Sequence, residues 1–184
     1  MYNVTMNTFQ AVRAHFERVA ASLLTVNQYE VEKAVRVLEQ AKADDAFVWI
    51  VGNGGSAATS SHFANDLEKM CGIRAISVPD MTPAILAHGN DEGWEKMFAN
   101  VIRRNSGPKD VVVAISCSGY SPNVIKVAED HSYNRLIVLT GDNEDSKLAQ
   151  IRPDALIMAP DEDIKVQEDI HLAVCHAIVA SLTA

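Results

Sequence analysis

The stretch that decides the fold is Trp49-Ile50-Val51-Gly52-Asn53-Gly54-Gly55-Ser56-Ala57-Ala58, followed by Thr59-Ser60-Ser61-His62-Phe63-Ala64-Asn65-Asp66-Leu67. The apolar run Phe47–Val51 predicts a short buried strand, and Ser56 opens a segment that we expect to be helical. The glycines between them permit φ > 0 and let another molecule come close to the backbone. Free N–H groups at a helix N-terminus favour an anion such as phosphate. Ser56 is expected to cap the helix and to donate its hydroxyl to the same anion.

An acid–base pair follows the glycines. His62 and Asp66 are four residues apart, so on a helix they share one face and can point toward one site. A strand, a glycine turn, a helix and such a pair together indicate a sugar-phosphate pocket. The alternative is an ordinary helix cap with a solvated histidine–aspartate pair, and these residues alone do not choose between the two.

Composition bounds the class of protein. The 184 residues are 48% hydrophobic and 22% charged, which predicts one globular domain. The net charge of −8 argues against a nucleic-acid partner, which needs a cationic surface. No apolar run has membrane-spanning length and the N-terminus has no signal-peptide pattern, so we expect no membrane association and a cytoplasmic protein. Cys71, Cys117 and Cys175 have no paired spacing and indicate neither a disulfide framework nor a cysteine zinc site.

The N-terminal segment predicts two amphipathic helices between Thr8 and Ala43. Apolar side chains recur there at spacings of three and four, at Phe9, Val12, Phe16, Val19 and Leu23, and again at Val31, Val35 and Leu38. We expect residues 1–45 to pack either on the domain or on another subunit, and residues 46–184 to form the domain itself. A helical arm surrounded by solvent would not need an apolar stripe of this length. We therefore predict a homo-oligomer, specifically a tetramer.

Strands and helices alternate through the rest of the chain. Apolar runs predict five strands, at Phe47–Val51, Ala75–Val78, Asp110–Ile115, Arg135–Thr140 and Ala155–Met158. Helical segments are expected at Ala57–Met70, Asp80–Ala87, Pro122–His131, Ser146–Ile151 and Asp163–Leu182. This alternation predicts an α/β fold in which helices cover both faces of a parallel sheet. Ligands of such sheets bind at the carboxyl ends of the strands, where the Gly52–Ser56 and Ser116–Ser121 loops emerge.

The second of these loops carries three serines in the sequence Ser116-Cys117-Ser118-Gly119-Tyr120-Ser121-Pro122-Asn123. Ser121 is a good N-cap, and Pro122 stands where the first helical residue should be. Capping does not explain Ser116 and Ser118. Their hydroxyls, together with free backbone N–H groups, would hold a phosphate without any arginine, so we favour phosphate binding over plain turn chemistry.

Taken together, the Gly52–Ala57 loop, His62 with a carboxylate four residues later, and the Ser116–Val124 segment resemble the sugar isomerase (SIS) domain. The positions of His62 and His176 make the chain similar to the phosphoheptose isomerase family over nearly its full length. The resemblance implies a flavodoxin-like three-layer sandwich and a homotetramer with sites at subunit interfaces. It also implies isomerisation of a sugar phosphate, often with zinc. The implied reaction converts sedoheptulose 7-phosphate to D-glycero-D-manno-heptose 7-phosphate, in lipopolysaccharide or capsule heptose biosynthesis.

The resemblance also assigns roles by position. Substrate-binding residues would be Asn53, Gly54, Gly55, Ser56, Asn90, Asp91, Ser116, Ser118, Ser121 and either Gln167 or Glu168. Zinc ligands would be His62, Asp66, Glu168 and His176, and the catalytic residues would be Asp66 and His176.

This sequence departs from the family pattern at three places. Asp66 stands where the family has a glutamate, which is one methylene longer. The family's Gln-Glu-x-His segment is Gln167-Glu168-Asp169-Ile170-His171 here, so either Gln167 or Glu168 occupies the glutamine position. Tyr120 stands where the family commonly has asparagine.

An aldose–ketose isomerase moves a proton between adjacent carbons through an enediol-like intermediate, which needs a base, an acid and exclusion of water. Asp66 would be the base and His176 the acid, or a metal would polarise the oxygens instead. The alternative for His176 is an ordinary buried histidine in an apolar helix. His171, five residues earlier and off that face, is expected behind the site.

Two other functions remain open. One is a noncatalytic SIS-domain tetramer that acts as a protein-binding regulator, of the kind that binds a replication initiator; such a protein need not keep a working base. The other is an isomerase for a different sugar phosphate.

Overall fold

The computed structural model describes residues 7–130 and 132–184, which form a five-stranded parallel sheet. The strands are β1 (Val48–Val51), β2 (Ala75–Ser77), β3 (Val111–Ser116), β4 (Arg135–Gly141) and β5 (Ala155–Ala159). Their spatial order is β2-β1-β3-β4-β5, and every adjacent pair is parallel. This is the flavodoxin-like order, in which the chain changes direction across the sheet between β1 and β3. The predicted fold class is confirmed.

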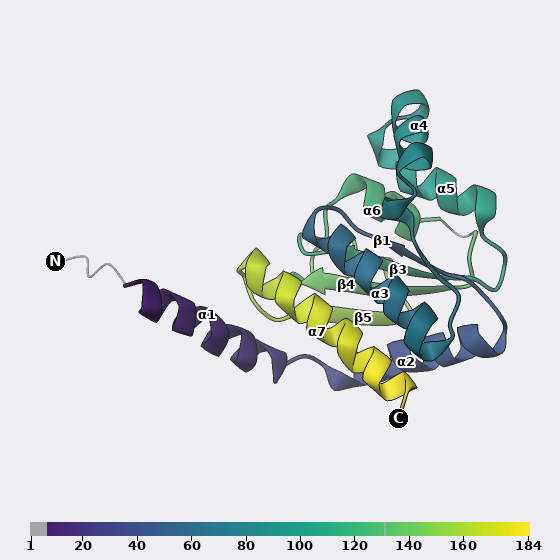
Figure 1. The fold of residues 1–184 in the computed structure, drawn as a ribbon. Helices are drawn as coiled ribbons and strands as arrows, with labels where there is room; N and C mark the ends of the chain where they lie inside the picture. The colour runs from purple at the N-terminus through teal and green to yellow at the C-terminus, as the bar shows by residue number, and fades with distance from the viewer. Residues whose placement is uncertain (1–6, 131) are drawn as a thin grey trace.

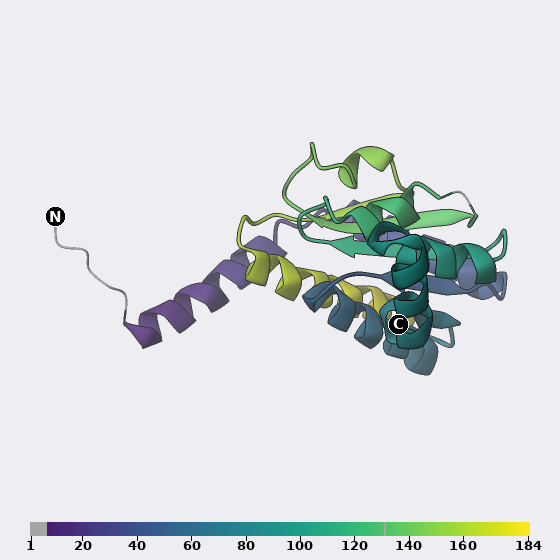
Figure 2. The same cartoon turned by 90° about the horizontal axis from the view of Figure 1, so that it is seen from above.

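Helices cover both faces of the sheet (Figures 1 and 2). One face packs against α2 (Gln28–Ala43), α3 (Gly55–Cys71) and α7 (Ile164–Leu182). The other packs against α5 (Met97–Asn105) and α6 (Pro122–Ala128). All residues of β1 and β3 are buried, because a central strand covered on both faces has no solvent side. Trp49 belongs to this core, as expected, and its indole N–H donates to Asp110 Oδ2 at 2.9 Å.

Some helix predictions differ from the structure. The helix expected over Asp80–Ala87 is a short 3₁₀ turn, η1 (Val78–Asp80), followed by α4 (Thr82–Glu92). After a second 3₁₀ turn, η2 (Trp94–Lys96), comes α5, which the sequence did not reveal. A nine-residue helix is too short to stand on its own propensity, and α5 is stabilised by burying six consecutive residues, 97–102, against its neighbours.

Two further helices are shorter than predicted. The expected helix over Ser146–Ile151 is only the 3₁₀ turn η3 (Ala149–Ile151), which the Ser146 hydroxyl precedes with a hydrogen bond from the backbone N–H of Ala149. The helix predicted from Pro122 ends at Ala128, and its predicted last residue, His131, lies outside the described residues.

The two N-terminal helices behave differently. Helix α2 packs on the sheet through Ala34, Leu38 and Ala41, all buried. Helix α1 (Thr8–Leu23) runs away from the body of the molecule in both views (Figures 1 and 2). Phe9 is 74% exposed and Phe16 67%, so the outer part of the predicted apolar stripe faces solvent in the single chain, whereas Val19 and Leu23 at its inner end pack against the core.

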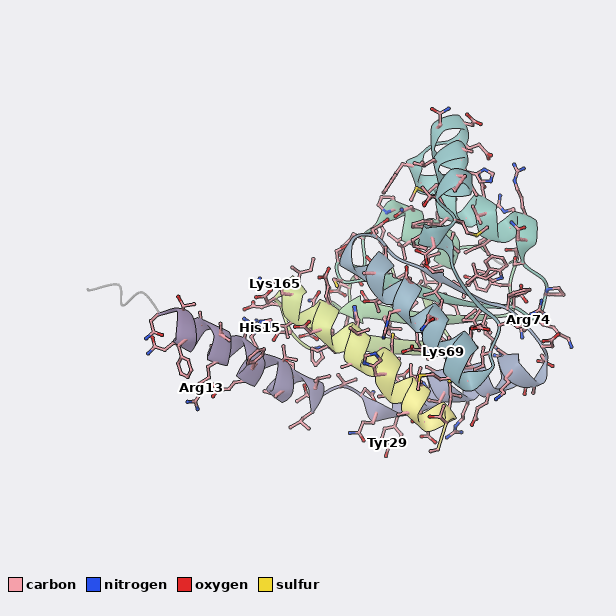
Figure 3. The ribbon with its side chains drawn as sticks, viewed as in Figure 1. Arg13, His15, Tyr29, Lys69, Arg74 and Lys165 are labelled. Carbon is pink, nitrogen blue, oxygen red and sulfur yellow. The ribbon has the colours of Figure 1, made fainter. Side chains whose placement is uncertain are left out.

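Polar contacts fix the direction of α1 at its inner end. Arg18 Nη2 lies 2.6 Å from Asp161 Oδ1, and the Ser22 hydroxyl donates to the same carboxylate. His15 lies beside the N-terminal part of α7, where its Nε2 is 3.0 Å from Asp169 Oδ2 (Figure 3). No partner for His15 was expected from the sequence. Within the described residues, the helices are all too short or too polar to cross a membrane.

Candidate active site

A pocket of about 270 Å³ lies at the carboxyl ends of β1 and β3, between the two loops singled out in the sequence. It is lined by Asn53, Gly54, Gly55, Ser56, Ile115, Ser116, Cys117, Ser118, Ser121, Ile164 and Glu168. After β1 the chain enters α3 on one face of the sheet, and after β3 it enters α6 on the other. The loops diverge there and leave a crevice, which is where sheets of this topology bind ligands.

The first wall of this serine pocket is the N-terminus of α3. Gly54 is its N-cap, with φ +54°, and no side chain caps the helix. The expectation that Ser56 is the cap is therefore wrong: Ser56 lies buried inside the first turn. The uncapped amides leave the positive end of the helix dipole at the pocket. Gly55 leaves room there for the carboxylate of Glu168, which a Cβ would displace.

The second wall is the serine loop. Ser121 is the N-cap of α6 by position, as predicted, but its hydroxyl makes no capping bond. Instead it accepts a hydrogen bond from the Ser116 hydroxyl at 3.1 Å, and the Ser118 hydroxyl lies 3.5 Å from that of Ser116. Three hydroxyl groups thus converge on one space, which capping alone does not explain.

The two walls are joined by a pair of amides. Asn53 Nδ2 donates to Asn123 Oδ1 at 2.8 Å, and Asn123 Nδ2 donates back to Asn53 Oδ1 at 2.9 Å. Asn123 is fully buried, and its role in holding the pocket was not predicted. The sequence does contain a signal for this role, which is the position of Asn123 directly after Ser121 and Pro122. A side-chain amide in the first turn of that helix lies close to the neighbouring loop.

Gln167 and Glu168 take different places. Glu168 lines the serine pocket, whereas Gln167 is buried behind it and donates from Nε2 to the backbone oxygen of Asp161 at 2.6 Å. Among the described residues that line the pocket, none is lysine, arginine or histidine. An anion there would be held by hydroxyls, backbone N–H groups and helix dipoles, with one carboxylate at the rim.

A separate cluster of His62, Asp66 and His176 lies where α3 and α7 run side by side. The two Nε2 atoms are 3.0 Å apart, and Asp66 Oδ2 lies 3.3 Å from that of His62 and 3.8 Å from that of His176. Ligand atoms about 2.0–2.1 Å from a tetrahedral zinc ion are about 3.3 Å from one another. The three side chains therefore fit a metal ion without rearrangement.

Glu168, also expected among the metal ligands, is not in this group of described residues. It precedes His176 by eight residues on α7, about 12 Å along the helix axis. Within one chain its carboxylate belongs to the serine pocket.

Residues 9–140 match the SIS domain family. The chain is a SIS domain protein. A phosphoheptose isomerase of Helicobacter pylori (strain P12) is 31% identical to it over 171 residues, which covers 90% of this chain and 88% of the relative. The structure of a phosphoheptose isomerase from Neisseria gonorrhoeae matches with a TM-score of 0.86 at 28% identity, covering 96% of this chain and 98% of the other. A phosphoheptose isomerase from Francisella tularensis, 21% identical over 96% of this chain and 98% of its own, shares the fold with a TM-score of 0.88.

The predicted Asn90–Asp91 pair lies elsewhere in this SIS domain. Both residues are exposed on α4, where the Asn90 amide donates to Asp91 Oδ1 at 2.7 Å. Asn90 lines a largely apolar pocket of about 450 Å³ that shares Asn53 and Gly54 with the serine pocket. The structure therefore brings Asn90, but not Asp91, to a space next to the predicted phosphate site.

Proposed function

We propose that this SIS domain protein is an aldose–ketose isomerase that converts sedoheptulose 7-phosphate to D-glycero-D-manno-heptose 7-phosphate. The observation that carries the proposal is the combination in one chain of a hydroxyl-lined pocket and a histidine–aspartate–histidine cluster. The relatives named phosphoheptose isomerase support the choice of substrate. The pocket suits the phosphate end of such a sugar, because free N–H groups and hydroxyls are donors that phosphate accepts from.

The cluster suits the reacting carbons. Asp66, 13% exposed, would take the carbon-bound proton, and His176 would protonate or deprotonate the sugar oxygens. In the alternative, a zinc ion held by His62, Asp66 and His176 would polarise those oxygens instead, and His176 would then be a ligand and not the acid. Three protein ligands leave one coordination position for the substrate, as in catalytic rather than structural zinc sites.

In one chain the pocket and the cluster are far apart. His62 follows Gly55 by seven residues on the same helix and Asp66 follows it by 11, which is about 10 and 16 Å along the helix axis. His62 and His176 are about half exposed, so a second molecule can reach them. We therefore propose that the cluster of one subunit faces the serine pocket of another in a homo-oligomer.

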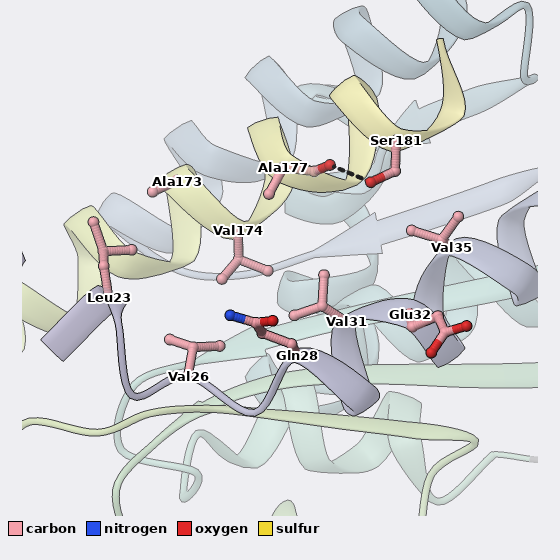
Figure 4. A pocket seen from close by; sticks show the side chains of 10 residues that line it. All are labelled: Leu23, Val26, Gln28, Val31, Glu32, Val35, Ala173, Val174, Ala177 and Ser181. Carbon is pink, nitrogen blue, oxygen red and sulfur yellow. Dashed lines mark hydrogen bonds between the residues drawn. The ribbon is translucent and has the colours of Figure 1, made fainter. Parts of the chain in front are cut away.

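A groove next to α7 supports this assembly. It has a volume of about 400 Å³ and is lined by Leu23, Val26, Gln28, Val31, Glu32, Val35, Ala173, Val174, Ala177 and Ser181 (Figure 4). The lining is mostly aliphatic, and the exposed residues of the α1 stripe, Phe9, Val12 and Phe16, are apolar as well. Leu23 at the inner end of the stripe already lines the groove, whereas the contacts of Arg18 and Ser22 direct the outer part of α1 away from the body (Figure 1). A second copy of the chain is the occupant that matches it.

The decisive assay offers sedoheptulose 7-phosphate and a panel of pentose, hexose and other heptose phosphates to the metal-loaded protein. Turnover of the first alone supports the proposal, and turnover of another sugar phosphate replaces the substrate. Binding without any turnover favours the noncatalytic regulator.

Mixing two inactive variants tests the shared site. The triple variant Ser116→Ala, Ser118→Ala and Ser121→Ala removes the hydroxyls of the pocket, and His176→Ala damages the cluster. If each site takes its pocket and its cluster from different subunits, random co-assembly leaves about a quarter of the sites intact. Activity that returns only after the variants are co-assembled supports the proposal. No return of activity in confirmed mixed oligomers contradicts it.

A further inference from the structure

A buried histidine lies directly behind the serine loop. His171 is 1% exposed, and its two ring nitrogens have partners on different elements. Nε2 is 3.0 Å from the backbone oxygen of Thr140, at the end of β4, and Nδ1 is 3.7 Å from Cys117 Sγ, inside the serine loop. This side chain therefore connects α7, β4 and the loop that forms one wall of the pocket.

The partners fix the tautomer of the ring. A backbone carbonyl only accepts hydrogen bonds, so Nε2 carries the ring proton and donates a hydrogen bond to the backbone oxygen of Thr140. Nδ1 then has a free lone pair, and the Cys117 thiol donates to it. Burial lowers the pKa of His171 to about 4, so the ring is neutral at ordinary pH. Burial likewise raises the pKa of the Cys117 thiol to about 11, which keeps its proton available.

Further hydrogen bonds join the serine loop to the end of β4, where Thr140 lies. The Thr140 hydroxyl donates to the backbone oxygen of Ser116 at 2.9 Å. The backbone oxygen of Cys117 accepts from the N–H of Gly141 at 2.9 Å. Gly119, with φ +66°, lies against the Ser146 hydroxyl, where a Cβ would overlap it. The side of the loop that faces away from the pocket is thus held by hydrogen bonds and close contacts. His171 contributes to this side by contacting both Cys117 and Thr140.

We propose that His171 is a positioning residue that holds the Ser116–Ser121 loop in the shape that binds phosphate. His171 is not itself a lining residue of the pocket or a member of the metal cluster, so it acts through Thr140 and through Cys117, which does line the pocket. The inference rests on the proposed function for the identity of the sugar phosphate, but the loop geometry requires only that the ligand contains a phosphate.

Three substitutions separate the two bonds. His171→Leu removes both. His171→Gln places an amide nitrogen near the position of Nε2 and keeps the donor to Thr140. His171→Asn places an amide oxygen near Nδ1 and keeps an acceptor for Cys117. Val179→Ala is the matched control, because it opens a cavity on the same helix, in the core and away from the loop.

Calorimetric titration with inorganic phosphate and with sedoheptulose 7-phosphate measures the effect on the full-length protein. We expect His171→Leu to weaken both affinities about tenfold, as the loss of one or two hydrogen bonds would. His171→Gln and His171→Asn should fall between it and the wild type. In steady-state assays KM should rise by a similar factor while kcat changes less than about twofold. Val179→Ala should lose stability without losing affinity.

The outcomes are distinguishable. Unchanged phosphate affinity in folded His171→Leu would overturn the inference, as would equal losses in the Val179→Ala control. Should His171→Leu fail to fold, His171→Gln and His171→Asn decide, and wild-type affinity in both would overturn it. A wild type that binds inorganic phosphate, loses that binding on His171→Leu and yet turns over no sugar phosphate supports the inference while rejecting the proposed function. A wild type that binds neither probe rejects both.

Discussion

The serine pocket and the His62–Asp66–His176 cluster are built in opposite ways. The pocket consists largely of backbone and short hydroxyl side chains, and buried neighbours such as Asn123 hold its parts in place. The cluster consists of three longer side chains from two helices, and two of the three are about half exposed. The pocket is therefore preorganised within one chain, whereas the cluster is open to solvent, as the proposed metal ion and second subunit would require.

Charge divides the two regions as well. The described lining of the pocket has no cationic side chain and one carboxylate. The cluster has two imidazoles whose nitrogens converge on one aspartate. Under the proposed function, the pocket would bind the phosphate through uncharged donors, and the cluster would activate the sugar through its imidazole and carboxylate groups. Substitutions in one region should leave the function of the other intact, and the following predictions test that separation.

The largest effect is expected for His176→Ala. Loss of an acid–base group that is also a metal ligand should lower turnover by about 1,000-fold or more. Metal content, measured by mass spectrometry after dialysis, should drop below that of the wild type. Phosphate affinity should stay within about twofold, because the pocket does not include this residue. A tenfold loss of phosphate affinity would mean that the two regions are not independent.

The second effect is the pH dependence of folding stability that arises from His171, the buried histidine behind the pocket. The pKa of His171 is lowered to about 4 by burial, against about 6.5 in an unfolded chain. Between these values the unfolded chain binds a proton that the folded chain does not. The stability that this group contributes is therefore complete above pH 6.5 and falls as the pH drops toward 4, by about 3 kcal/mol in total.

Urea unfolding between pH 4 and pH 7.5 checks this prediction. His171→Gln has no titrating ring, so its stability should depend less on pH over that interval than the wild type's does. The comparison uses the difference between the two proteins, because carboxylates common to both cancel. Parallel curves would show that His171 is not the group responsible.

The third effect concerns Asp66, whose carboxylate is one methylene shorter than the family's glutamate. Asp66→Asn removes the proposed base, so turnover should fall as it does in His176→Ala, and phosphate binding should stay unchanged. If the cluster is built around aspartate, Asp66→Glu displaces the carboxylate and should lower turnover by about 100-fold. Higher turnover with glutamate would instead identify the cluster as a weakened copy of the family's. Turnover by Asp66→Asn equal to that of the wild type would remove Asp66 from the mechanism.

The smallest effect is expected for Ser118→Ala. One hydroxyl among several donors is lost, so affinity for inorganic phosphate should fall about tenfold, with metal content unchanged. Ser118 is exposed in the single chain, and its hydroxyl accepts a hydrogen bond from the backbone N–H of Tyr120 and lies 3.5 Å from the Ser116 hydroxyl, so the fold should tolerate the change. Unaltered affinity in this variant would place the phosphate elsewhere.

Local patterns in the sequence were sufficient for most elements of the fold. The strand runs, the glycine turn, the serine loop and the His62–Asp66 spacing involve residues close in the chain, where backbone periodicity decides which side chains share a face. The misses are also instructive. Helix α5 forms because its neighbours bury it. Ser56 makes no capping bond because α3 begins before it, with Gly54 as the N-cap, and the Ser121 hydroxyl accepts from Ser116 instead of capping α6.

The sequence by itself therefore determined the parallel α/β fold, the two ligand loops and the pairing of a histidine with a carboxylate on one helix. Only the tertiary structure decided that His176 meets His62 across 114 positions of the chain, and that α1 turns outward. The tertiary structure also decided that Glu168 lines the pocket and that Gln167 does not. Neighbouring residues on a helix point about 100° apart, so only the docking of α7 against Gly55 and Gly141 decides which of the two enters the pocket. Periodicity sets the faces of a helix, but packing against distant segments sets what each face meets.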